Sequence, residues 1–90
     1  MTQEIYLEMT YRRGKALAGY LYLPRKNRDS VHHSKETAQS LVVDYAEDGR
    51  PIGIEIVDPA GASFERINEL LAELHQRALA KEELAPLLAG

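Results

Sequence analysis

The chain has 90 residues, of which 44% are hydrophobic and 28% charged, and its formal net charge is −3. This length and composition fit one globular domain with a single modest core and argue against wholesale disorder. The acidic balance argues against non-specific nucleic-acid binding, which requires a basic surface. Because no cysteine is present, disulfides, thiolate metal sites and thiol catalysis are excluded, a composition that suits a reducing cytoplasm.

The N-terminal residues lack the basic segment and apolar run that are typical of a signal peptide. No apolar run approaches the length that is needed to cross a bilayer. We therefore expect a soluble, cytoplasmic protein that makes no membrane contact.

Two strands are expected near the N-terminus. Residues 3–11 alternate apolar and polar side chains, so that Leu7 falls on one face and Tyr6 on the other. A period of two is typical of a β-strand. After a turn at Gly14, residues 16–23 form the next expected strand.

The second of these strands is apolar on both faces. Leu17, Leu21 and Leu23 are expected on one face, and Tyr20 and Tyr22 on the other. A helix can cover only one face of a small sheet, so we expect the tyrosine side either to form an interface or to be covered by the N-terminal residues or by residues 24–38.

The middle of the chain predicts a weak strand followed by a clear hairpin. Residues 31–36 define no buried face and are expected to form an edge strand or an extended loop. Residues 40–46 and 51–57 alternate strongly, and Asp48–Gly49 lies between them as a turn signal. The expected cross-strand pairs are Leu41–Ile56, Val42–Glu55, Val43–Ile54, Asp44–Gly53 and Tyr45–Ile52.

The C-terminal third changes to a helical period. Ser63 is expected to cap a helix over residues 63–78, and a shorter helical turn is expected at 81–88, where Pro86 prevents a long continuation. These elements predict the α+β class: an antiparallel meander of four to five strands, with an amphipathic helix packed on one face. The apolar stripe of this helix contains Phe64, Ile67, Leu71, Leu74 and Ala78.

Residues 44–55 approach the pattern of a calcium-binding EF-hand loop, and a hairpin is the better interpretation. Ala46 occupies the third ligand position and has no side-chain oxygen. Pro51 occupies the eighth position of the loop, where a calcium loop has a different type of residue, and the flanking segments alternate as strands. In the hairpin, Asp44 and Glu55 share one face as diagonal neighbours. They are the candidate functional carboxylates.

The hairpin "VVDYAEDGRPIGIEIVDPA", together with "MTY" and "AGYLYL", resembles the small bacterial family known as domain of unknown function 2283. The resemblance covers about residues 7–60 and implies a compact β-rich cytoplasmic domain, without an established activity. Where the family commonly has an acidic stretch after its first tyrosine, this chain has "RRGKAL". The matching residues are Tyr11, Tyr20, Leu21 and Leu23 in the first motif, and Asp44, Asp48, Gly49, Gly53, Ile54, Glu55 and Ile56 in the second.

Other side chains with chemical potential have simpler explanations. His32 and His33 are adjacent and point to opposite faces of a strand, and His75 lies far away on the helix, so no zinc site is expected. Ser63 lacks the glycine that a nucleophile elbow requires. No cofactor is therefore expected. The basic residues fall in two separated loop clusters, Arg12, Arg13 and Lys15, and Arg25, Lys26 and Arg28, which does not favour one nucleic-acid patch.

The leading hypothesis is a non-enzymatic interaction or structural module that acts as a homodimer or with a small protein partner. Its candidate interface consists of Tyr6, Tyr20, Tyr22 and Val42. An accessory or antitoxin-like role follows by analogy only. The alternative is a small-ligand-binding or catalytic domain that uses Asp44 and Glu55.

Overall fold

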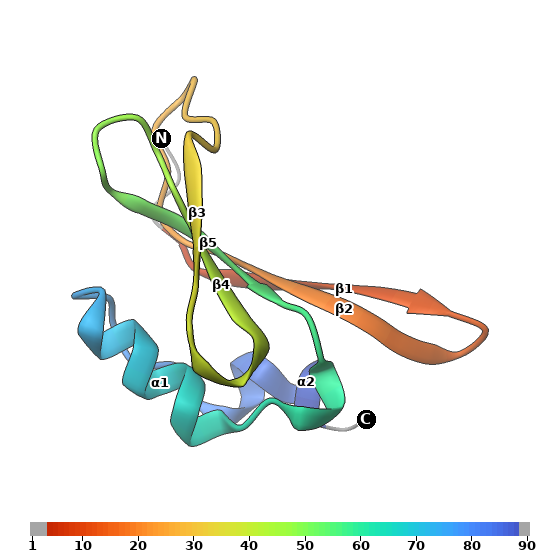
Figure 1. Ribbon diagram of the computed structural model, residues 1–90. Helices are drawn as coiled ribbons and strands as arrows, with labels where there is room; N and C mark the ends of the chain where they lie inside the picture. Colours follow the sequence, from red (N-terminus) through yellow and green to blue (C-terminus); the bar gives the residue numbers. More distant parts are fainter. Residues whose placement is uncertain (1–3, 89–90) are drawn as a thin grey trace.

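The computed structural model describes residues 4–88, which form a five-stranded antiparallel sheet with short helices (Figure 1). The expected start of the first strand, at residue 3, lies outside the described residues. Among residues 4–88, none of the helices has the length and apolar character that a bilayer crossing requires. The strands are β1 (Tyr6–Arg12), β2 (Lys15–Tyr22), β3 (His33–Glu36), β4 (Leu41–Tyr45) and β5 (Pro51–Ile56); the α-helices are α1 (Phe64–Glu73) and α2 (Ala85–Leu88); and the 3₁₀ helices are η1 (Ala38–Ser40), η2 (Pro59–Gly61) and η3 (Lys81–Leu84).

The strands do not follow one another across the sheet, so the expected meander is wrong. Their order is β1-β2-β5-β4-β3, and the connection after β2 leads to the far edge of the sheet. A meander would place β3 in the centre. The side chains of β3, "HSKE", are all exposed and polar, which suits an edge, whereas β5 is apolar and suits the centre.

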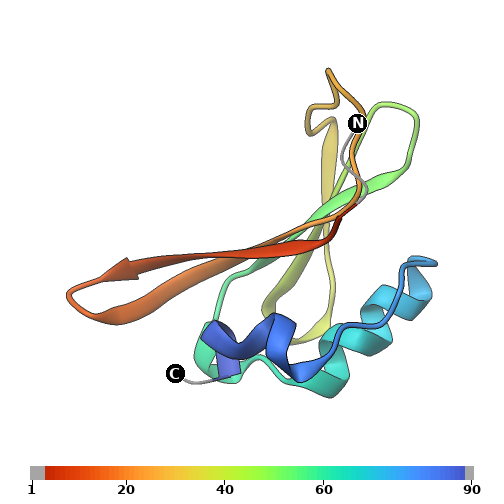
Figure 2. The same cartoon turned by 180° about the vertical axis from the view of Figure 1, so that it is seen from behind.

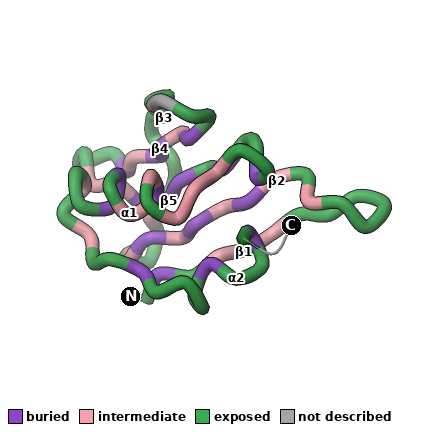
Figure 3. The backbone as a smooth tube through the Cα atoms, turned by 90° about the horizontal axis from the view of Figure 1, so that it is seen from below, coloured by how far each residue is buried: buried purple, intermediate pink, exposed green. Residues whose placement is uncertain are grey.

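Cross-strand rows explain where the core lies. Leu21 of β2 pairs with Ile54 of β5, which pairs with Val43 of β4, and all three side chains are fully buried. Figure 3 shows this burial running through β2, β5 and β4. One apolar cluster joins such strand residues to residues from the C-terminal helices, among them Ile67, Leu70, Leu71, Leu84 and Leu87.

The β1–β2 hairpin extends beyond the rest of the sheet as an arm (Figures 1 and 2). Only Gly19–Tyr22 of β2 pairs with β5. Within the arm Thr10 pairs with Ala18 but Tyr11 pairs with Ala16, which leaves Leu17 unpaired in a β-bulge. The expectation that Leu17 shares the face of Leu21 is therefore wrong, because the extra residue reverses the alternation. Its side chain is 55% exposed.

The β4–β5 hairpin has a three-residue loop and a compensating bulge. The amide of Ala46 donates to the Arg50 carbonyl (2.9 Å), and Gly49 within the loop has φ +90°. Tyr45 pairs with Pro51, so Ile52 is the bulged residue and the expected Tyr45–Ile52 pair is wrong. The other four expected pairs are present, because the odd loop and the bulge cancel.

Helix α1 ends at Glu73, five residues before the expected end at residue 78. His75 adopts a left-handed φ of +59°. The amide of Gln76 donates to the Leu71 carbonyl (2.8 Å), and that of His75 to the Ala72 carbonyl (3.1 Å), which is the Schellman arrangement of a helix C-terminus. At the N-terminus the Arg66 amide donates to the Ser63 hydroxyl at 3.0 Å.

The segment after α1 is held by one side chain. Asn68 donates through Nδ2 to the Leu79 carbonyl (3.0 Å) and accepts the Leu79 amide through Oδ1 (2.8 Å). These two bonds satisfy the backbone of an irregular segment and place the Leu79 side chain in the core, where it is buried. If a regular helix continued to residue 78, backbone groups of this segment would bond within the helix and would not be available to Asn68.

We expect Gly49→Val to lower the free energy of unfolding by about 1–2 kcal/mol, because a β-branched residue is strained at a positive φ. Urea denaturation would measure the change. Glu47→Val is the matched control, since Glu47 is exposed in the same loop and does not have a positive φ. Equal stability of wild type and Gly49→Val would contradict the strained turn.

Candidate functional site

Two rows of side chains cross one face of the sheet, which we call the tyrosine face. Alternation along each strand places these rows opposite the buried row that contains Leu21. The first row is Glu8–Tyr20–Glu55–Val42–Glu36, and the second is Tyr6–Tyr22–Gly53–Asp44–Ser34. All four expected interface residues and both candidate carboxylates lie on this face.

Asp44 is a buried carboxyl group at the centre of this face. Its exposed fraction is 4%, and it is the one polar or charged residue buried to this extent among residues 4–88. The Tyr20 hydroxyl donates to Oδ2 at 2.8 Å, and the Ser34 hydroxyl donates to Oδ1 at 2.6 Å. Two strands that are not neighbours of each other, β2 and β3, thus supply the donors that make this burial tolerable.

Gly53 makes the Tyr20–Asp44 bond possible. Gly53 lies between them on β5, directly opposite Asp44 on one side and Tyr22 on the other. A Cβ on Gly53 would overlap with the hydroxyl and ring of Tyr20. The tyrosine therefore lies across a position where no side chain fits.

Arg25 completes the cluster from the connection after β2. Its Nη2 donates to the Tyr20 hydroxyl at 2.9 Å, and its Nε donates to the Ile52 carbonyl at 2.9 Å. The guanidinium carbon lies 5.0 Å from the centre of the Tyr22 ring, a cation–π distance. A chain of hydrogen bonds thus runs from Arg25 through Tyr20 to Asp44.

Burial and neighbouring charges shift the acidities in this cluster. Burial first, then the hydrogen bond to Asp44, raises the pKa of Tyr20 well above its ordinary value, so the phenol stays a donor. Burial, followed by the hydrogen bond to Asp44 and its charge, raises the pKa of Glu55. Asp44 and Glu55 thus act on each other, although they are diagonal rather than directly opposite.

Tyr6 and Tyr22 form a stacked pair at the β1 side of the face. Their ring centres are 4.5 Å apart with 14° between the planes, and the Tyr6 side chain is 49% exposed. The Tyr22 hydroxyl donates to Glu8 Oε1 at 3.3 Å. Burial of the hydroxyl, followed by the charge of Glu8, raises the pKa of Tyr22. We call Tyr6, Tyr22 and Glu8 the tyrosine corner.

The face is shallowly hollowed between the tyrosine corner and Asp44. The depression has a volume of about 590 Å³ and is lined by side chains that include Glu8, Tyr20, Arg25, Asp44 and Glu55. Both oxygens of Asp44 already accept hydroxyl donors, so this carboxyl group acts as an anchor for its neighbours. Among residues 4–88, no three acidic or histidine side chains come together in a way that could hold a metal ion.

Some of the side chains in this cluster were not expected there. Arg25 was assigned to a solvated loop cluster, and Ser34 was not singled out at all. The strand signal in the sequence gives no information on either residue, because their approach to Asp44 depends on the strand order. Val42, by contrast, lies half-buried beside Glu55 as the expected pairing places it.

The rings of His32 and His33 are not oriented to bind one metal ion together. Their ring centres are 5.9 Å apart with 86° between the planes. His33 stacks on Tyr45 at 4.8 Å, which gives it a packing contact on the edge strand.

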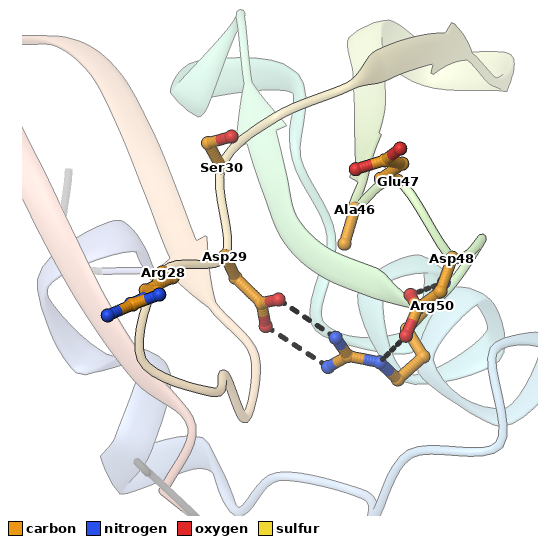
Figure 4. Close-up of a pocket in the computed structure, with 7 residues that line it drawn as sticks. All are labelled: Arg28, Asp29, Ser30, Ala46, Glu47, Asp48 and Arg50. Atoms are coloured by element: carbon orange, nitrogen blue, oxygen red, sulfur yellow. Dashed lines mark hydrogen bonds and ion pairs between the residues drawn. The ribbon is translucent and has the colours of Figure 1, made fainter.

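A second depression, of about 440 Å³, is lined by residues of the loop after β2 and of the β4–β5 turn (Figure 4). Arg50 donates to both carboxylate oxygens of Asp29, at 2.8 and 3.1 Å, and through Nε to Asp48 at 2.7 Å. These bonds lower the pKa of both aspartates. Asp48 is thus hydrogen-bonded to Arg50 beside Gly49. The bonds from Arg50 to Asp29 connect this turn to the loop that contains Arg25.

Comparison with known families finds a match in the middle of the chain. Residues 18–58 match the family described as "Protein of unknown function (DUF2283)". The resemblance expected from the sequence is therefore confirmed, over a shorter range than the expected 7–60. The matched range contains Tyr20, Arg25, Ser34, Asp44 and Glu55, and it does not include β1. Neither the curated proteins nor the solved structures contain a significant match.

We expect Gly53→Ala to cost about 2–3 kcal/mol of unfolding free energy, because the added methyl group overlaps with Tyr20. Urea denaturation of a double-mutant cycle would test this cause. In a Tyr20→Ala background the same substitution should cost close to nothing, since the overlapping ring is gone. An equal cost in both backgrounds would show that Tyr20 is not the obstacle.

We expect Glu55 to make stability depend on pH. In the unfolded chain Glu55 ionises near 4.5, and in the folded chain it ionises at a higher pH. Its contribution is therefore fully present below pH 4.5 and is lost as the pH rises through the raised value. Relative to wild type, Glu55→Gln should become more stable as the pH rises through this window.

Urea denaturation at a series of pH values would measure this difference. Glu36→Gln is the matched control, because Glu36 is an exposed glutamate in the same row of the face. Parallel stability curves for wild type and Glu55→Gln would contradict the raised pKa of Glu55.

Proposed function

We propose that this chain, a relative of the DUF2283 family through residues 18–58, is a non-enzymatic interaction module. Its tyrosine face binds protein, either a second copy of the chain or a small protein partner. An accessory or antitoxin-like role would suit such a module by analogy.

The observation that carries this proposal is the exposed aromatic stack of Tyr6 and Tyr22. Half of the Tyr6 side chain is in contact with solvent, although it stacks on a second ring. Aromatic side chains that are ordered before binding lose little conformational entropy when a partner covers them, which is why they dominate the energetic centres of interfaces. Arg25 further orders Tyr22 from within the chain.

The availability of this face is the second support. We infer that α1 and α2 pack on the opposite face, because the apolar cluster joins Leu21 and Ile54 to Ile67 and Leu71. The exposed and half-buried side chains of the tyrosine face then have no counterpart on a helix among residues 4–88. A face that has aromatic rings at the tyrosine corner and polar side chains around them has the composition of an interface.

A second candidate is a small-ligand or catalytic site at Asp44 and Glu55, favoured by the shallow depression and by the raised pKa of Glu55. Its weakness is that Asp44 is already occupied by Tyr20 and Ser34. A ligand site of this kind would leave the oligomeric state independent of Tyr22, which separates it from the homodimer in the following experiment.

We expect Tyr22→Asp to shift the mass measured by light scattering towards that of the monomer. The substitution removes the stacking partner of Tyr6 and places a second negative charge beside Glu8. Leu88→Asp is the matched control, because Leu88 is an exposed apolar side chain on α2, outside the tyrosine face. An unchanged mass for Tyr22→Asp would show that the chain does not form a homodimer through this face.

A further inference from the structure

Strand β1 is an edge strand with an open backbone. It has seven residues and pairs with β2 alone. Among residues 4–88, none of the backbone hydrogen bonds made by turns and loops involves β1. A long edge strand of this kind is a template for pairing with another strand, unless proline, a covering segment or charge protects it.

The other edge of the sheet is less suited to pairing. Strand β3 has four residues, all exposed, and carries Lys35. Lysine and short length are the usual devices that prevent edge pairing. β1 contains no proline, and its two charged residues, Glu8 and Arg12, have opposite signs, so they can complement a second copy. The Arg13–Gly14 turn that follows β1 has φ values of +52° and +79°, as an ordered type I′ hairpin requires.

We propose that two copies of the chain pair their β1 strands in antiparallel orientation, with Thr10 of each copy opposite Thr10 of the other. This proposal deepens the proposed function and rests on it, since it commits the partner to a second copy and adds an edge to the tyrosine corner. The interface is isologous, as two-fold symmetry requires.

Charge complementarity selects this register. Pairing about Thr10 places Glu8 opposite Arg12 of the second copy, and two-fold symmetry repeats the pair. Opposite charges directly across an antiparallel pair stabilise it, and like charges destabilise it. All three side chains are exposed and belong to one face of the strand by alternation.

Neighbouring registers lose this complementarity. A pairing centred on Glu8 places the two Glu8 carboxylates opposite each other. A pairing centred on Tyr11 places Arg12 opposite Thr10. A pairing centred on Met9 places Glu8 opposite Thr10, so that Arg12 of the second copy is only a diagonal neighbour of Glu8.

The Thr10 register also connects the edge to the tyrosine corner. The residue diagonal to Arg12 of the second copy is Tyr6, so the guanidinium reaches both Glu8 and the exposed Tyr6 ring. Arg25 already occupies the inner side of the stack, over Tyr22. Arg12 of the second copy would supply the matching cation at the outer side of the stack, over Tyr6.

Cysteine cross-linking tests the register directly, because the chain contains no cysteine. Directly opposite residues have Cα atoms about 4.5–5.5 Å apart, which lies within the range of a disulfide. We expect Thr10→Cys to form a covalent dimer under mild oxidation, seen by non-reducing electrophoresis. Oxidation in the presence of denaturant should not yield this dimer, because the folded β1 edge is then absent.

Two further variants serve as matched controls. In the proposed register, two copies of residue 8 lie about 13 Å apart along the strand, too far for a disulfide. Glu8→Cys alone and Arg12→Cys alone should therefore remain monomeric on the gel, whereas an oxidised mixture of the two should cross-link. Cross-linking of Glu8→Cys alone, or its absence in Thr10→Cys, would overturn the register.

Charge reversal provides an independent measurement. We expect Arg12→Glu to raise the dimer Kd at least tenfold by analytical ultracentrifugation, and Glu8→Arg combined with Arg12→Glu to restore it. Arg13→Glu, one residue beyond the paired strand, should have a smaller effect. Failure of the double variant to recover would overturn the Glu8–Arg12 pairing.

The outcomes separate this inference from the proposed function. If Tyr22→Asp yields a monomer while Thr10→Cys fails to cross-link, the tyrosine face binds a second copy and the edge pairing is wrong. If Thr10→Cys cross-links while Tyr22→Asp leaves the mass unchanged, the edge pairing stands and the tyrosine corner contributes nothing.

Discussion

The tyrosine face depends on one constraint, the burial of the Asp44 carboxyl group. A carboxyl group removed from water needs hydrogen-bond donors, and here they are the hydroxyls of Tyr20 and Ser34. Tyr20 reaches Asp44 only because Gly53 has no side chain. Strands β2, β3, β4 and β5 therefore meet at this group, and a change in strand order would leave it without its donors.

Register is the means by which the chain satisfies this constraint. The β4–β5 loop has an odd number of residues, which would by itself turn Asp44 away from Gly53. The bulge at Ile52 restores the match. In the β1–β2 arm the bulge at Leu17 has the opposite effect, because nothing compensates it: the tip of the arm reverses its alternation, and Leu17 is exposed.

The tyrosine corner has the features that we propose for a binding surface. Tyr20 is engaged with Asp44, and its raised pKa keeps it protonated. Tyr6 and Tyr22 are ordered by stacking, and Tyr6, on the edge strand β1, remains half exposed. We therefore expect a partner to bind where the ordered side chains of the tyrosine corner lie next to the unpaired backbone of β1. The Asp44 network supports this corner through Tyr20 and Arg25, which contacts both Tyr20 and Tyr22.

The sequence by itself determined the elements that depend on local chemistry. Alternation identified the β4–β5 hairpin and four of its five pairs, Ser63 marked the start of α1, and the motif around Gly53 indicated the resemblance to the DUF2283 family. Asp44 and Glu55 were placed on one face by the same alternation. These features follow from side-chain period and turn chemistry, which are local properties.

Only the tertiary structure decided what brings distant segments together. The polar side chains of residues 31–36 suggested an edge position, but the complete order β1-β2-β5-β4-β3 depends on which strands pair across the sheet, and local patterns do not specify those pairings. Arg25 and Ser34 join Asp44 only as a result of that order. The end of α1 at Glu73 similarly depends on Asn68 holding Leu79, a contact between segments. Helix period alone extends the helix further, because it contains no information about a packing partner.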